Sequence, residues 1–230
     1  MKNVYLILLF SFFSVSAQTN FEKGQKMMEQ KKYGEAKPFL ENSIKENRKD
    51  YKAIDYLGEI AIYSQNWDEA IACGKKLIIA FPKNADYWYK YGGAMGLKAK
   101  SVNKFKALGM IDDVENAFLT AAKLDSKHIE ARWALVMFYT ELPGIVGGSE
   151  SKAQKYANEL SSISKVDGYL AKGYIDSYFN RYANAEINYL KAYEIGHSKT
   201  TFNKLYDLYL NKLKDKQKAI NLKEQFDEKV

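Results

Sequence analysis

Apolar residues recur at spacings of three and four along most of this chain, which is the pattern of one buried helix face. The 230 residues include only three prolines, and runs of β-branched residues are few. Clear amphipathic segments lie at 112–124 (DDVENAFLTAAKL) and 151–160 (SKAQKYANEL). The pattern therefore predicts an all-α chain.

The helical pattern itself repeats every 34 residues, most clearly over 51–84. There, small residues are expected where two antiparallel helices cross closely, and Pro82 ends the second helix because it cannot continue one. The marks of this unit are Leu57, Gly58, Ala61, Ala70, Leu77 and Pro82. The same frame gives units at about 17–50, 85–128, 129–165, 166–199 and 200–230.

This spacing of small and large residues resembles the tetratricopeptide repeat (TPR), a helix–turn–helix unit of the same length. The resemblance covers nearly all of residues 18–230. The chain as a whole resembles exported bacterial TPR proteins. It implies an α-solenoid of five to six repeats that forms a right-handed superhelix, with 200–230 as a terminal capping pair. Two units are lengthened by insertions, at Lys98–Met110 and Leu142–Gly148.

In TPR arrays the first helix of each unit lines a concave groove, which usually binds an extended peptide or a partner helix. The resemblance therefore implies a set of groove residues that is aromatic and somewhat acidic: Asp55, Glu59, Tyr63, Tyr89, Trp133, Met137, Tyr174 and Tyr178, with Glu141 on the same face. For Trp133 the alternative is packing against neighbouring helices. The lysine and asparagine clamp of chaperone-binding members is absent, so an acidic peptide tail is not expected.

The first 17 residues have the composition of a secretory signal peptide. Lys2 precedes an apolar run, Val4–Phe13, that is shorter than the ~20 residues of a spanning helix. Val15, Ser16 and Ala17 then supply the small residues of a cleavage site. We expect cleavage near Ala17, a periplasmic or secreted protein, and no transmembrane segment in residues 18–230.

Charge and metal-ligating residues add little. The formal net charge is +7, but lysines alternate with acids as on solvated helix faces. Because export is also expected, nucleic acid is not an expected partner. Cys73 is the only cysteine and is expected in the core. His128 and His197 fall near unit ends and are expected to be turn or surface residues. We predict no metal site and no cofactor.

The stretch LPGIVGGSESKA, residues 142–153, contains the Ser149-x-x-Lys152 spacing of some serine hydrolases. The other elements of that catalytic machinery are missing, so Ser149 is predicted to cap the helix that follows. Its glycines also lack the lysine and the preceding strand of a phosphate loop. We predict that Pro143, Gly144, Gly147, Gly148 and Ser149 form a loop between two helices.

No catalytic set emerges, so the sequence favours a non-enzymatic, exported TPR scaffold that binds a protein or peptide segment in its groove. The alternatives are a small-ligand-binding accessory of a transporter, and an envelope-assembly or glycan-handling component. The two insertions either pack against each other or form a binding surface. The partner, the pathway and the oligomeric state are not fixed by the sequence.

Overall fold

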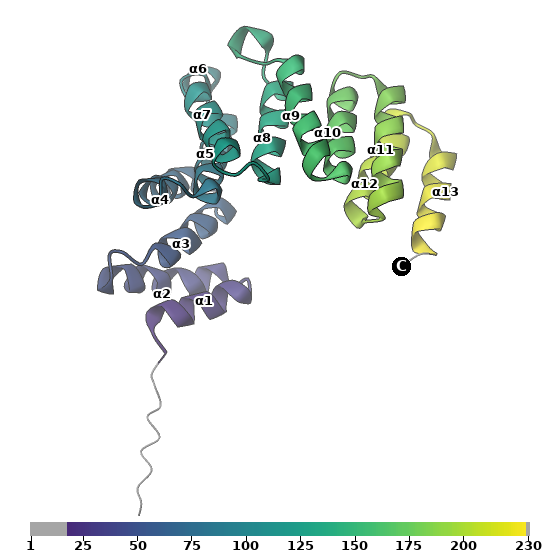
Figure 1. The fold of residues 1–230 in the computed structure, drawn as a ribbon. Helices are drawn as coiled ribbons and strands as arrows, with labels where there is room; N and C mark the ends of the chain where they lie inside the picture. The colour runs from purple at the N-terminus through teal and green to yellow at the C-terminus, as the bar shows by residue number, and fades with distance from the viewer. Residues whose placement is uncertain (1–17, 229–230) are drawn as a thin grey trace, which may run out of the picture. The chain divides into compact units, whose positions relative to one another are not determined.

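The computed structural model describes residues 18–228, and within that range every regular element is a helix (Figure 1). The predicted signal peptide lies outside the described residues. The helices are α1 (Asn20–Glu29), α2 (Tyr33–Glu46), α3 (Tyr51–Tyr63), α4 (Trp67–Ala80), α5 (Ala85–Ser101), α6 (Lys104–Leu108), α7 (Ile111–Leu124), α8 (Ile129–Glu141), α9 (Glu150–Ile163), α10 (Lys165–Tyr178), α11 (Tyr182–Gly196), α12 (Lys199–Asp207) and α13 (Lys216–Asp227), with a 3₁₀ turn, η1 (Gly144–Val146), and a π-helical turn, η2 (Leu208–Lys212).

Short polar side chains define where many of these helices begin. The first turn of a helix has backbone N–H groups without intrahelical acceptors, and a side-chain oxygen at the preceding position can accept one of them. Thr19 and Glu22 form a reciprocal capping box at the start of α1. Side-chain caps of the same kind come from Asn66, Asn84, Asn103, Ser149, Ser164, Ser198 and Asp215.

Tight turns end several first helices at matching places. Lys31, Gln65 and Asn180 adopt left-handed backbone conformations, with φ of 58°, 55° and 59°. At each one the residue that follows donates its N–H to a carbonyl five positions earlier, as in Asn66 N to Ala61 O at 2.8 Å. This is the Schellman ending, which usually employs glycine. Lys31 and Gln65 are 34 residues apart, so the turn recurs with the repeat.

The chain divides into two compact units, one ending at Ile60 and the other beginning at Ala61. In unit 1, α1 packs against α2. The contact is close: a Cβ built on Gly24 would lie 2.7 Å from the Leu40 side chain, which is itself fully buried.

In unit 2, consecutive helices pack on one another, with extensive contacts between α5 and α7, α8 and α9, α9 and α10, and α10 and α11. Gly173 allows α10 to approach α11, because a Cβ there would lie 2.5 Å from the ring of Tyr189. Two core clusters run through the unit, one centred on Leu135 and Leu160 and the other on Leu205 and Leu208. Paired helices stacked in series confirm the predicted all-α solenoid of TPR-like units.

The insertion at Lys98–Met110 consists of two consecutive segments. Its first residues extend α5, which reaches Ser101 and is 17 residues long, whereas α7, α8 and α9 have 13 or 14. The rest forms the short helix α6, none of whose residues is buried. Cys73 is buried within α4, as expected. None of the helices formed by residues 18–228 has the length and apolar character needed to cross a membrane.

Candidate functional site

The C-terminal ends of α5, α8 and α10 bring together three side chains that are far apart in sequence. Lys100 Nζ donates to Glu141 Oε2 at 2.7 Å, and Tyr174 Oη donates to Glu141 Oε1 at 2.6 Å. Tyr178 lies one turn after Tyr174 and donates its hydroxyl to the Glu141 backbone carbonyl at 3.4 Å. We call Lys100, Glu141, Tyr174 and Tyr178 the Glu141 cluster.

The contacts in the cluster favour an ionised Glu141 and a neutral Tyr174. Burial opposes ionisation of Glu141, but the hydrogen bonds from Lys100 and Tyr174 and the charge of Lys100 outweigh it, so the pKa of the carboxyl is lowered. Burial, followed by the hydrogen bond to Glu141 and its charge, raises the pKa of Tyr174. Tyr174 therefore stays a neutral donor beside an ionised acceptor at physiological pH.

Two predicted groove residues, one of them a member of this cluster, are exposed next to Glu141. Met137 lies one helical turn before Glu141, on the same face of α8, and is 39% exposed. Tyr178 is 46% exposed. A flexible thioether and a tyrosine ring thus flank a carboxylate whose two oxygens are already hydrogen-bonded.

Two other predicted groove residues are engaged in packing. Trp133 is half-buried between the two core clusters, and its Nε1 donates to Asp167 Oδ1 at 2.8 Å. This bond ties α8 to the first turn of α10. Tyr89 is also half-buried, and its ring lies 6.1 Å from that of Phe118. Both side chains help hold first helices in place.

The remaining groove residues lie on α3, where Asp55, Glu59 and Tyr63 follow one another at four-residue intervals on one face. Asp55 and Glu59 belong to unit 1 and are half-buried. Tyr63 belongs to unit 2 and is 64% exposed.

His128 lies at the turn between α7 and α8, one of the two placements expected for it, and it is buried there. It is 5% exposed and caps α8, with Nδ1 accepting from Ala131 N at 3.2 Å. Nε2 lies 3.2 Å from Asp86 Oδ1, although the geometry does not make a hydrogen bond. An imidazole nitrogen with a free lone pair can replace the usual capping oxygen, which a search for Ser, Thr, Asn or Asp caps misses.

The loop between α8 and α9 is a compact turn. Val146 N and Gly148 N both donate to Pro143 O, at 3.0 and 3.1 Å, and Ser149 N donates to Tyr139 O at 2.9 Å. Gly147 has φ of 101°, and Gly144 sits in open space. The Ser149 hydroxyl caps α9 by accepting a hydrogen bond from Lys152 N at 3.3 Å. The contact between these two residues therefore involves the backbone amide of the lysine.

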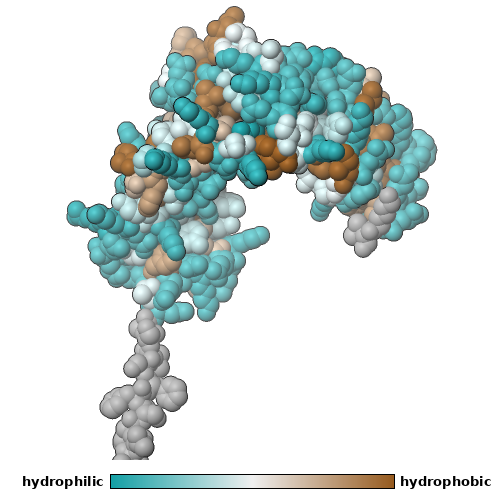
Figure 2. Space-filling view, viewed as in Figure 1, coloured by the Kyte–Doolittle hydropathy of each residue, from teal (hydrophilic) through white to brown (hydrophobic). Residues whose placement is uncertain are grey.

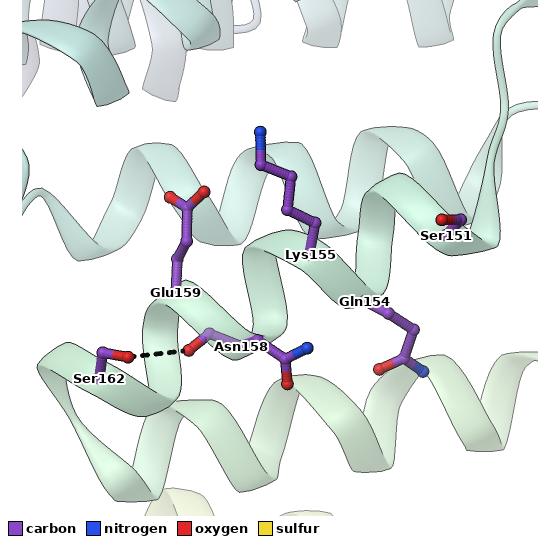
Figure 3. A pocket seen from close by; sticks show the side chains of 6 residues that line it. All are labelled: Ser151, Gln154, Lys155, Asn158, Glu159 and Ser162. Carbon is purple, nitrogen blue, oxygen red and sulfur yellow. Dashed lines mark hydrogen bonds between the residues drawn. The ribbon is translucent and has the colours of Figure 1, made fainter.

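A shallow pocket lies on α9, a second helix and therefore outside the predicted groove (Figure 3). Its side chains diverge: Lys155 and Glu159 point to one side of the helix, and Gln154 and Asn158 to the other. Ser162 Oγ donates to the Asn158 carbonyl at 3.3 Å. A small-molecule site needs a few polar groups that converge, and these do not.

Proteins of known structure share this fold. A thermophilic TPR protein from Thermus thermophilus aligns with a TM-score of 0.66 and 15% identity, over 83% of this chain and 97% of its own. YrrB, described as a TPR protein with an unusual peptide-binding site, aligns with a TM-score of 0.54 and 15% identity, over 79% and 87% of the two chains. Human IFIT1, solved as a dimer with PPP-AAAA, gives 0.65 and 20% identity, over 89% of this chain and 50% of its own.

No family model and no curated protein sequence matches this chain. At the identities found among solved structures, the likeness shows the fold and not the ligand.

Proposed function

From the tetratricopeptide repeat fold of this chain, we propose that the protein is a non-enzymatic, exported scaffold whose first-helix face binds an extended segment of another protein. The observation that carries the proposal is the exposure of Met137 and Tyr178 next to Glu141. These two side chains come from neighbouring first helices, α8 and α10.

The chemistry of this surface suits an uncharged peptide with an apolar anchor. Met137 can adapt its shape to an aliphatic or aromatic side chain. Tyr178 offers a rigid ring and a hydroxyl, which makes it a good contact residue. Because Lys100 offsets the charge of Glu141, neither a strongly acidic nor a strongly basic segment gains much there.

The solved relatives support a binding role without choosing the ligand. YrrB is described with a peptide-binding site, whereas human IFIT1 is solved with PPP-AAAA. We favour a peptide because nucleic-acid backbones are bound through lysines and arginines that are free to neutralise phosphates. In the Glu141 cluster the lysine is already paired with a carboxylate.

The test begins with selection of binders from a random peptide library on residues 18–230, followed by calorimetric affinity measurement. We expect Met137→Ala and Tyr178→Ala each to weaken the selected peptide by about tenfold or more, as for central contact residues. Ile187→Ala is the matched control, since Ile187 is 53% exposed but lies on α11, a second helix. A library without binders, or equal affinity for all three variants, would reject the groove proposal.

Export is tested separately by expressing the full chain with its first 17 residues. We expect N-terminal sequencing of the mature protein to begin at Gln18 and fractionation to place it outside the cytoplasm. A mature protein that retains Lys2 in the cytoplasm would overturn the export proposal and leave the groove proposal standing.

A further inference from the structure

The two insertions start from helix ends that touch each other. Lys100 is in the last turn of α5 and Glu141 is the last residue of α8, and the two form an ion pair at 2.7 Å. The first insertion continues into α6, and the second into η1. Figure 2 shows hydrophobic side chains over α6 and over the loop between α8 and α9, along the upper edge of unit 2 in that view.

Three apolar side chains of the insertions are exposed to solvent, whereas Met110 packs against the core. Phe105 is 88% exposed, Leu108 47% and Ile145 96%. We call these three residues the insertion tips. At such exposure neither Phe105 nor Ile145 packs against the other insertion, so mutual packing does not explain why they are apolar.

The backbone holds the tips in place. Asn103 caps α6 by accepting from Lys106 N at 3.0 Å. In the second insertion, Pro143 O accepts from both Val146 N and Gly148 N, around the exposed Ile145. Large apolar side chains that are held in water are unfavourable in free energy. Contact with another apolar surface would bury them and recover that free energy.

Two lysines beside the tips are available to anions. Residues 98–110 contain four lysines and no acidic residue, but Lys98 pairs with Asp68 and Lys100 pairs with Glu141. The other two, Lys104 and Lys106, flank Phe105 and are exposed. The second insertion, Leu142–Gly148, contains no charged residue. The tips therefore combine exposed apolar groups with adjacent positive charge.

We propose that the insertion tips dock unit 2 onto the surface of an anionic phospholipid bilayer. Phe105, Leu108 and Ile145 enter the boundary between headgroups and acyl chains, while Lys104 and Lys106 contact lipid phosphates. A specific protein partner is a poorer fit, because stable protein interfaces bury about 800 Å² on each side. Three separate side chains on two short segments provide less than that, whereas a bilayer accepts isolated insertions.

The experiment measures co-sedimentation of residues 18–230 with vesicles of phosphatidylcholine alone or mixed with phosphatidylglycerol. We expect binding only to the mixed vesicles and weaker binding at high salt, as for electrostatic attraction to anionic lipid. The double variant Phe105→Ser with Ile145→Ser and the double variant Lys104→Glu with Lys106→Glu should each lower the partition coefficient by about tenfold or more.

Each variant has a matched control. Ile187→Ser with Ile195→Ser removes two exposed isoleucines from α11, and Lys123→Glu with Lys127→Glu makes the same charge change at the α7–α8 turn. Both controls should bind like the unmodified protein, and circular dichroism should be the same for all. Absence of binding, or equal losses in the tip variants and the controls, would overturn the proposal.

Analytical ultracentrifugation without lipid tests the remaining alternative, which is that the tips contact a second copy of this chain. If the unmodified protein self-associates and does not bind vesicles, and the Phe105→Ser, Ile145→Ser variant is a monomer, the tips contact a second copy and the lipid proposal is wrong. Peptide affinity at the Glu141 cluster should not change in the tip variants, so failure here leaves the proposed function intact.

Discussion

At the scale of single residues, the buried side chain of Arg132 makes four hydrogen bonds. Its side chain is 7% exposed, and Nε donates to Glu159 at 3.0 Å. Its two terminal nitrogens donate to the carbonyls of Ala122, Asp125 and His128, which close the turn between α7 and α8. One guanidinium thus satisfies three buried or half-buried carbonyls and one carboxylate.

We therefore predict that Arg132→Ala lowers the free energy of unfolding by about 3 kcal/mol, because it leaves these acceptors without donors. Arg132→Lys should recover less than half of that loss, since an ammonium cannot reproduce the fork of donors. Urea unfolding followed by circular dichroism measures both. Lys123→Ala, on the exposed side of α7, should change stability by less than about 0.5 kcal/mol. Equal stability of the Arg132 variants and this control would contradict the assignment.

At the scale of elements, the loop between α8 and α9 depends on Gly148 more than on Gly144. A Cβ built on Gly148 would lie 1.8 Å from the Leu142 carbonyl oxygen, whereas one on Gly144 meets nothing within 4 Å. We predict that Gly148→Ala destabilises the protein by about 1–3 kcal/mol through forced backbone movement. Gly144→Ala should be near neutral.

Differential scanning calorimetry of the two alanine variants checks this prediction. A melting temperature for Gly148→Ala that equals the one for Gly144→Ala would show that the loop relaxes freely. In that case its compact hydrogen-bonded form would not be needed for the stability of α8 and α9.

The helices were predictable because three- and four-residue apolar spacing and polar caps act locally. The Schellman turns at Lys31 and Gln65 were not. Lysine and glutamine are uncommon in left-handed conformations, so nothing in their identity marks the turn. They adopt it because the packing of both flanking helices fixes where the chain must reverse. Only the 34-residue spacing between them carries that information.

The candidate site shows the same limit. Glu141 and Tyr174 could be placed on the first-helix face from the repeat, but Lys100 lies in an insertion and has no counterpart in the standard unit. Its contact with Glu141 depends on how far α5 extends, which the sequence did not reveal. The bond between Trp133 and Asp167 joins residues 34 apart, so repeat spacing could have suggested that pair.

For the whole molecule, the tyrosines of successive repeats act together at high pH. Burial, followed by the charge of Glu186 and a hydrogen bond to it, raises the pKa of Tyr209 to about 12. Burial is also the main cause that raises the pKa of Tyr139, Tyr174 and Tyr189. An unfolded tyrosine has a pKa of about 10, so the folded state holds these protons more tightly.

The stability that these tyrosines contribute is complete below pH 10 and falls as the pH rises through 10 towards their folded pKa values. We predict cooperative alkaline unfolding in that window, with tyrosinate absorbance and loss of helical dichroism rising together. In urea the same tyrosines should ionise near pH 10 in one non-cooperative step. Matching titration curves with and without urea, with the helix signal unchanged, would refute this.

The position of Cys73 has a practical consequence. Because it is the only thiol in the chain and is buried in α4, a disulfide reagent can reach it only when that part of unit 2 opens. The ratio of its reaction rate to that of a free thiol then gives the equilibrium constant for that local opening. Without any engineered residue, the native protein reports the integrity of α4 from one defined atom, and the same assay can be repeated on every variant proposed above.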